Sequence, residues 1–89
     1  MTKVYVLVLE YSSDGDISVE VVCVKSNKED AQKAFEDQYN EIMQMEHWAK
    51  AVADDSVEID KTDTSAFAEM MCDDYYFNLL LEEKIVDEL

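Results

Sequence analysis

The chain has a single glycine, Gly15, and no proline, and the glycine lies between two apolar runs. Residues 3–11 and 17–25 are rich in valine, leucine and tyrosine, which favour β-strands. An Asp-Gly pair between two such runs is the strongest short signal for a β-hairpin, because glycine readily adopts the positive φ that a tight turn requires. The sequence therefore predicts an N-terminal hairpin that turns at Asp14 and Gly15. With so little glycine and proline a flexible linker is not expected, and residues 1–89 are predicted to form one small domain.

The first predicted strand carries apolar side chains on both of its faces. Successive side chains of a strand point to opposite sides. Three valines therefore share one face and larger apolar residues share the other: Val4, Val6 and Val8 against Tyr5, Leu7, Leu9 and Tyr11. This pattern predicts a central strand of a sheet.

Residues 27–53 are predicted to form one long amphipathic helix. Ser26 with Glu29 three residues later fits a capping box, and Asn27 is the alternative N-cap. We expect Trp48 to lie in or beside the core together with aromatic residues of the apolar stripe. That stripe recurs at helical spacing: Ala31, Ala34, Phe35, Gln38, Tyr39, Ile42, Met45, Ala49 and Val52.

The last third of the chain predicts a second hairpin. Residues 56–60 alternate briefly, residues 66–71 favour a strand, and a turn at 72–74 leads to another strand over 75–86. A C-terminal helix over 75–86 is the rival interpretation, because this segment contains good helix formers such as Leu79. The predicted class is α+β, in the order β-β-α-β-β, with an antiparallel sheet and one long amphipathic helix packed on one face.

A single helix covers only one face of such a sheet. The other face would then expose part of the apolar set of the first strand, and an exposed apolar patch usually marks an interface. We therefore hypothesise that the uncovered sheet face mediates self-association, giving a homodimer, or the docking of a partner.

The charge balance restricts the classes of partner. The chain has 22 Asp and Glu against 7 Lys, no Arg, and a formal net charge of −15. Nucleic-acid phosphates and anionic lipids should repel it, whereas basic protein surfaces, including nucleic-acid-binding clefts, should attract it. Because 48% of the residues are hydrophobic, we expect a folded domain with an acidic surface.

Compartment and chemistry follow from what the sequence lacks. The N-terminal apolar run has neither the length nor the cleavage site of a signal peptide, so a cytoplasmic protein is expected, with Cys23 and Cys72 as reduced thiols. These two cysteines and His47 have no metal-ligand spacing, and no motif marks an activated nucleophile. No metal, no cofactor and no enzymatic activity are predicted.

The acidic residues themselves are the candidate site. Side chains two apart on a strand lie ~6.6 Å apart, and helical residues one turn apart lie ~5.4 Å apart, so carboxylates can follow a phosphate-like track. The alternative is that the charge serves solubility. The predicted partner-binding residues are Glu36, Asp37, Glu41, Asp54, Asp55, Asp73, Asp74, Glu82 and Glu83.

The aromatic run Tyr75-Tyr76-Phe77 beside two aspartates allows two interpretations. It could supply an interface anchor with an acidic rim. It could equally be an ordinary strand with alternate faces buried, and this second interpretation is preferred.

The pattern resembles small acidic proteins of bacteriophages and mobile elements, in particular anti-CRISPR proteins and other DNA mimics. The resemblance is carried by the strand at 3–7, the Asp14-Gly15 hairpin, the helix opening at 26–31, the closing segment 82–86 and the acidity. It implies a non-catalytic inhibitor that binds the basic nucleic-acid-binding cleft of a host defence protein, such as a CRISPR effector, in the bacterial cytoplasm. The alternative is a small accessory module that self-associates through its sheet.

Overall fold

The computed structural model describes residues 2–13, 15–71 and 75–86, which form five strands and two helices. The chain begins with two strands, continues with two consecutive helices and ends with three strands. The elements are β1 (Thr2–Ser13), β2 (Asp16–Lys25), α1 (Lys28–Met43), α2 (Glu46–Ala53), β3 (Val57–Lys61), β4 (Ser65–Met70) and β5 (Tyr76–Val86).

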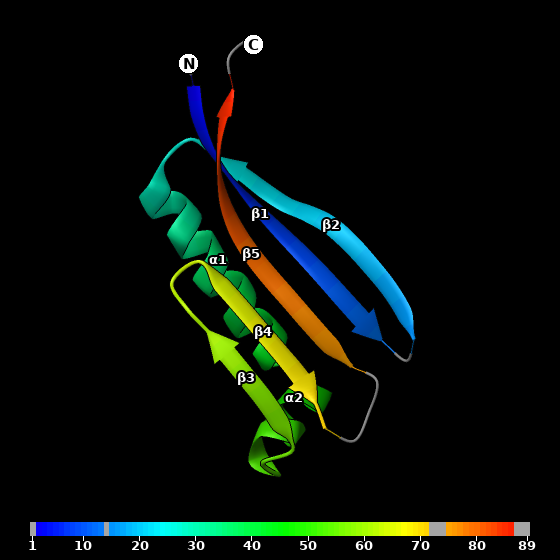
Figure 1. The fold of residues 1–89 in the computed structure, drawn as a ribbon. Coiled ribbons are helices and arrows are strands. Elements are labelled where there is room, and N and C mark those ends of the chain that lie inside the picture. The colour runs from blue at the N-terminus through cyan, green and yellow to red at the C-terminus, as the bar shows by residue number, and fades with distance from the viewer. Residues whose placement is uncertain (1, 14, 72–74, 87–89) are drawn as a thin grey trace.

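All five strands form one antiparallel sheet in the order β2-β1-β5-β4-β3 (Figure 1). The last strand, β5, lies between the β1–β2 pair and the β3–β4 pair, and it pairs with β1 over the length of the sheet, from Thr2 opposite Val86 to Ser12 opposite Tyr76. The α+β class and the antiparallel sheet are confirmed. The predicted order β-β-α-β-β is wrong in detail, because Val57–Lys61 is a strand of its own and the helical region is divided.

The predicted N-terminal hairpin is present, and its strands are longer than expected. Gly15 has φ of 90°, a left-handed conformation that glycine adopts without a steric cost. Asp14, its predicted partner in the turn, lies outside the described residues. The pairing of β1 with β2 shifts between Leu7, opposite Cys23, and Val8, opposite Val21, which leaves Val22 as the extra residue of a β-bulge.

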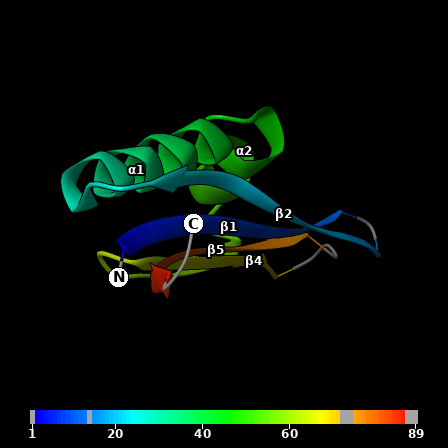
Figure 2. The same cartoon turned by 90° about the horizontal axis from the view of Figure 1, so that it is seen from above.

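Both helices lie on the same side of the sheet, and the opposite face is uncovered (Figure 2). Phe35 of α1 and Trp48 of α2 are fully buried, and the Trp48 ring meets Phe77 edge-on, with 5.1 Å between the ring centroids. The sheet supplies its inward-facing residues to this core: Leu7, Leu9, Ala66, Ala68, Met70, Phe77, Leu79 and Leu81. The predicted division of β1 into two faces is confirmed, since its valines point away from the helices.

The predicted single helix is interrupted at Met45, whose φ of −61° and ψ of 142° are extended. In an unbroken helix Met45, Ala49 and Val52 would continue the buried stripe. Instead Met45 and Val52 are 43% and 48% exposed, whereas Trp48 is completely buried. The break turns α2 so that its largest apolar side chain enters the core, where the Trp48 indole N–H donates to the Tyr11 hydroxyl at 2.9 Å. The burial of one large aromatic residue thus outweighs the continuity of the helix.

The two remaining alternatives for local structure are settled. Asn27 is the N-cap of α1, because its side-chain oxygen accepts from the backbone N–H groups of Glu29 and Asp30 at 2.7 and 3.3 Å. The segment after residue 75 is a strand, with Phe77 and Leu79 buried and Asn78 exposed between them. The turn predicted at 72–74, which includes Cys72, lies outside the described residues. Among the described helices, none is long and apolar enough to cross a membrane.

Candidate protein-binding surface

The uncovered sheet face is divided into an apolar end and an acidic end. Cross-strand pairing fixes which side chains are neighbours on it, because residues directly opposite in an antiparallel pair share a face. On the side of β2, Val19 and Val21 lie opposite Glu10 and Val8 of β1. The apolar end, here called the valine patch, consists of Val6, Val8, Ile17, Val19, Val21 and Val24.

The acidic end lies on β3, β4 and the adjacent parts of β5 and β1. One row of neighbours runs from Tyr76 to Glu69 and then to Glu58. The next row runs from Glu10 through Asn78 and Phe67 to Asp60. We call this group the acidic corner, and it consists of Glu10, Glu58, Asp60 and Glu69 around Phe67 and Tyr76.

Two aromatic rings form the apolar centre of the acidic corner. The Phe67 ring is 38% exposed, and its centroid lies 6.0 Å from that of Tyr76. Phe67, Glu58 and Asp60 also line an open hollow at the β3 edge of the sheet. Tyr76 is held in place because its hydroxyl donates to Glu10 Oε2 at 2.7 Å. This hydrogen bond, together with desolvation and the negative charge of Glu10, raises the pKa of Tyr76 above its usual value.

In the described part of the chain, no lysine neutralises the carboxylates of the acidic corner. Glu58 lies directly opposite Glu69, a like-charge arrangement that destabilises a sheet. Within residues 2–13, 15–71 and 75–86, none of the four carboxylates forms an ion pair with a lysine. The corner therefore presents negative charge around an accessible aromatic ring.

The acids predicted on the helix lie in the layer away from this face. Glu36 of α1 pairs with Lys61 of β3 at 2.9 Å, and Asp37 pairs with Lys33 at 2.7 Å. The Lys61 ammonium also lies 5.5 and 5.2 Å from the ring centroids of two α1 residues, Phe35 and Tyr39. Of the predicted partner-binding residues, Glu36 thus links α1 to the edge strand β3, and Asp37 forms an ion pair within α1.

The other predicted acids are distributed over several surfaces. Glu41 is exposed on α1, and Asp54 and Asp55 follow at the end of α2. Glu82 lies on the uncovered face and pairs with Lys84 at 3.0 Å, whereas Glu83 points to the helix side and pairs with Lys3 at 3.7 Å. Asp73 and Asp74 lie outside the described residues. The described members of the predicted set therefore do not form one continuous surface.

Sequence reasoning missed the four carboxylates of the acidic corner and Phe67. The alternation of side chains along each strand was a signal for them, because it places Glu58 and Asp60 on one face of β3 and Phe67 and Glu69 on one face of β4. The aromatic run is resolved as an ordinary strand, because Phe77 is buried and Tyr76 points to the opposite face.

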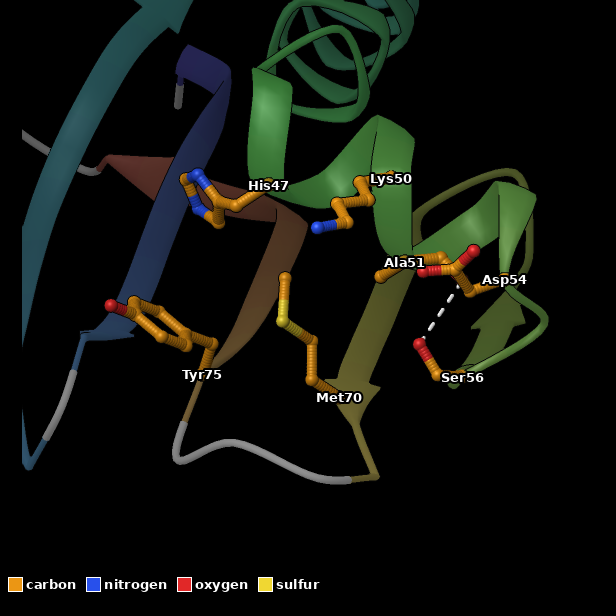
Figure 3. Close-up of a pocket in the computed structure, with 7 residues that line it drawn as sticks. All are labelled: His47, Lys50, Ala51, Asp54, Ser56, Met70 and Tyr75. Atoms are coloured by element: carbon orange, nitrogen blue, oxygen red, sulfur yellow. Dashed lines mark hydrogen bonds between the residues drawn. The ribbon is translucent and has the colours of Figure 1, made fainter.

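A pocket of about 480 Å³ lies on the other side of the molecule, between α2 and the ends of β4 and β5 (Figure 3). His47, Lys50, Met70 and Tyr75 line it, and the rings of His47 and Tyr75 are 5.3 Å apart. Two of its polar side chains make hydrogen bonds within the fold. His47 Nε2 is hydrogen-bonded to the Tyr11 hydroxyl at 2.9 Å, and Ser56 Oγ donates to the Ala51 carbonyl of α2 at 3.3 Å.

No cluster of three or more histidine, cysteine or acidic side chains suited to a metal ion occurs among the described residues. Cys23 is a free, partly buried thiol beside the core. Comparisons with protein-family models, curated proteins and solved structures found no match.

Proposed function

We propose that the protein is a non-catalytic binding protein whose acidic corner occupies the basic nucleic-acid-binding cleft of another protein, in the cytoplasm of a bacterial cell. The observation that carries the proposal is the placement of Glu58 directly opposite Glu69 beside the exposed Phe67 ring, with no lysine ion-paired to either carboxylate among the described residues. A host defence protein that binds nucleic acid is the leading candidate for the partner.

The like-charge pair favours a binding role over a role in solubility alone. Like charges directly opposite each other in a sheet cost roughly 0.2–1 kcal/mol. Acids on the exposed face of α1, such as Glu29 and Glu41, provide solubility without that cost. An arrangement that lowers stability and gathers charge around an aromatic ring is typical of a surface that has a partner.

The spacing of the carboxylates suits a site that normally holds phosphates. Glu58 and Asp60 lie two apart on one face of a strand, ~6.6 Å, and cross-strand neighbours such as Glu58 and Glu69 have Cβ atoms ~5 Å apart. These separations are smaller than the Debye length of about 8 Å at physiological ionic strength, so the charges act together on an approaching lysine or arginine. Phe67 adds a ring face against which an arginine guanidinium can stack.

The proposal is tested by capture from a nuclease-treated bacterial lysate on the immobilised full chain. The test variant replaces three corner acids, as Glu58→Gln, Asp60→Asn and Glu69→Gln. The matched control removes the same three charges from the helix layer, as Glu41→Gln, Glu46→Gln and Asp54→Asn. Both variants have a formal net charge of −12, obtained from −15 by removing three carboxylates.

The expected result is a basic nucleic-acid-binding protein that the wild-type chain and the helix-layer control retain and the corner variant loses. Its retention should weaken steeply between about 0.1 and 0.5 M salt, because the binding is electrostatic, and duplex DNA should displace it. Equal retention by the two variants would show that the corner is not the binding surface. A retained protein that neither salt nor DNA displaces would refute the mechanism.

A further inference from the structure

The two edge strands of the sheet, β3 and β2, differ in length and in exposed apolar residues. The β3 edge is five residues long, and three of its side chains are charged: Glu58, Asp60 and Lys61. Such short, charged edges are a common protection against pairing with other chains. The β2 edge is ten residues long, and Ile17, Val19, Val21 and Val24 are 55–65% exposed on the uncovered face. The three charged residues of β2, Asp16, Glu20 and Lys25, point to the helix side, so apart from the bulge at Val22 the uncovered face of this edge lacks the protection that β3 has.

We propose that this edge pairs with β2 of a second copy of the chain, as an antiparallel strand pair about a two-fold axis at Val19. Figure 1 shows β2 as the outermost strand of the sheet, where β1 is its one neighbouring strand among the described residues. The inference rests on the β2 edge alone and is independent of the function proposed for the acidic corner.

Charge selects a second copy as the occupant. The exposed side chains of β2 on the uncovered face, Ile17, Val19, Val21 and Val24, are all apolar, so an identical strand suits them better than a basic partner does. Glu10 is the member of the acidic corner nearest to β2, and in the dimer the two Glu10 residues are three strand spacings apart, or about 14 Å. This is beyond the Debye length of about 8 Å, so two patches can meet while the acidic corners stay apart.

The register of β2 is self-complementary about Val19. Val19 then faces its own copy, Ile17 faces Val21, and Ser18 faces Glu20, so that no like charges lie opposite each other. A shift of the axis by one residue places either the two Glu20 carboxylates opposite each other or Asp16 opposite Glu20, and both are unfavourable. A shift by two residues to Val21 centres the pairing beside the bulge at Val22, so the axis at Val19 is preferred.

The exposed apolar area predicts a weak dimer. At roughly 100 Å² for a buried valine side chain, the four exposed residues of β2 offer at most about 250 Å² of apolar surface per copy, and edge pairing covers only the sides of these residues. This lies at the low end of specific interfaces, below about 1,200 Å² in total, so association in the micromolar range or weaker is expected. The dimer would carry its two acidic corners at opposite ends of a ten-stranded sheet and bind a two-site partner with avidity.

The experiment is sedimentation equilibrium of the full chain from about 10 μM to about 1 mM protomer, at low and at moderate salt. Val19→Lys and Val19→Glu each place two like charges at the axis, so both should weaken association at least tenfold. Ile59→Lys and Ile59→Glu make the same changes at an exposed position of β3 and should leave association unchanged. Circular dichroism checks that all four variants are folded.

Salt separates this inference from the proposed function. Salt should strengthen the dimer, because it screens two chains of charge −15, whereas it should weaken binding to a basic partner. Backbone amides of β2 should exchange more slowly at high protein concentration than at low concentration. A monomer throughout the range, or opposite effects of Val19→Lys and Val19→Glu, would overturn the proposal.

Discussion

The Tyr11 hydroxyl connects the sheet to α2 through two hydrogen bonds. Its removal tests how strongly these bonds stabilise the position of α2. It accepts from Trp48 Nε1 at 2.9 Å and is hydrogen-bonded to His47 Nε2 at 2.9 Å. The Trp48 side chain is completely buried. In Tyr11→Phe the indole N–H therefore loses its acceptor at a position that water does not reach, whereas the exposed His47 can bond to solvent.

The expected cost follows from this difference. A buried donor without a partner costs about 1–3 kcal/mol, and the solvent-exposed bond to His47 adds little. A loss of about 2 kcal/mol is a large part of the total stability of an 89-residue domain, roughly 4–13 kcal/mol. It should lower the melting temperature by roughly 8–16 °C.

Urea unfolding followed by the fluorescence of Trp48, the only tryptophan, measures the effect directly. Tyr39→Phe is the matched control, because it removes the same atom from a partly buried tyrosine whose hydroxyl makes no hydrogen bond within the described structure. The control should change the free energy of unfolding by less than about 0.5 kcal/mol. If Tyr11→Phe destabilises the protein no more than Tyr39→Phe does, the account of the helix break is refuted.

Three further results are expected. Glu58→Gln removes the repulsion between Glu58 and Glu69, so it should raise the free energy of unfolding, measured in urea, by about 0.2–1 kcal/mol. The gain should be larger at low salt than at high salt, and a loss of stability would contradict this reasoning. In a spectrophotometric titration, Glu10→Gln should lower the raised pKa of Tyr76. Because the folded-state pKa of Tyr76 is the higher one, its contribution to stability is present below pH 10 and is lost as the pH rises through the folded value; unchanged titration would exclude the hydrogen bond. Asn27→Ala should cost about 0.5–2 kcal/mol in thermal unfolding and Ser26→Ala much less, and the reverse order would favour the capping box.

Local signals in the sequence predicted most of the elements. Gly15 fixed the first hairpin and the alternation in β1 identified a central strand, because both depend on residues that are close in the chain. Local signals could not predict the helix break, because it depends on a hydrogen bond from Trp48 to Tyr11, which lies 37 residues earlier in the chain. The strand order was equally hidden, because the predicted second hairpin, formed by β4 and β5, meets the first through pairing of β5 with β1, between the two ends of the chain.

The candidate surface was missed for a related reason. Sequence reasoning favoured acids that are adjacent in the chain, such as Glu82 and Glu83. In a strand, adjacent side chains point to opposite faces, so these two carboxylates are separated by the sheet itself. The acidic corner instead combines residues from β1, β3 and β4, whose adjacency only the sheet topology reveals.

The position of β5 explains why two chemically different surfaces coexist on one face. By lying between β1 and β4, it separates the valine-rich hairpin from the acidic hairpin by a full strand. Along this strand the uncovered face changes from Leu80, opposite Val8, to Tyr76, which donates to Glu10. The same strand supplies Phe77 and Leu79 to the core, so it holds the two hairpins together on one side and keeps their surfaces apart on the other. A chain of charge −15 can thus keep apolar side chains exposed on β2, because the two acids of that strand, Asp16 and Glu20, point to the helix side.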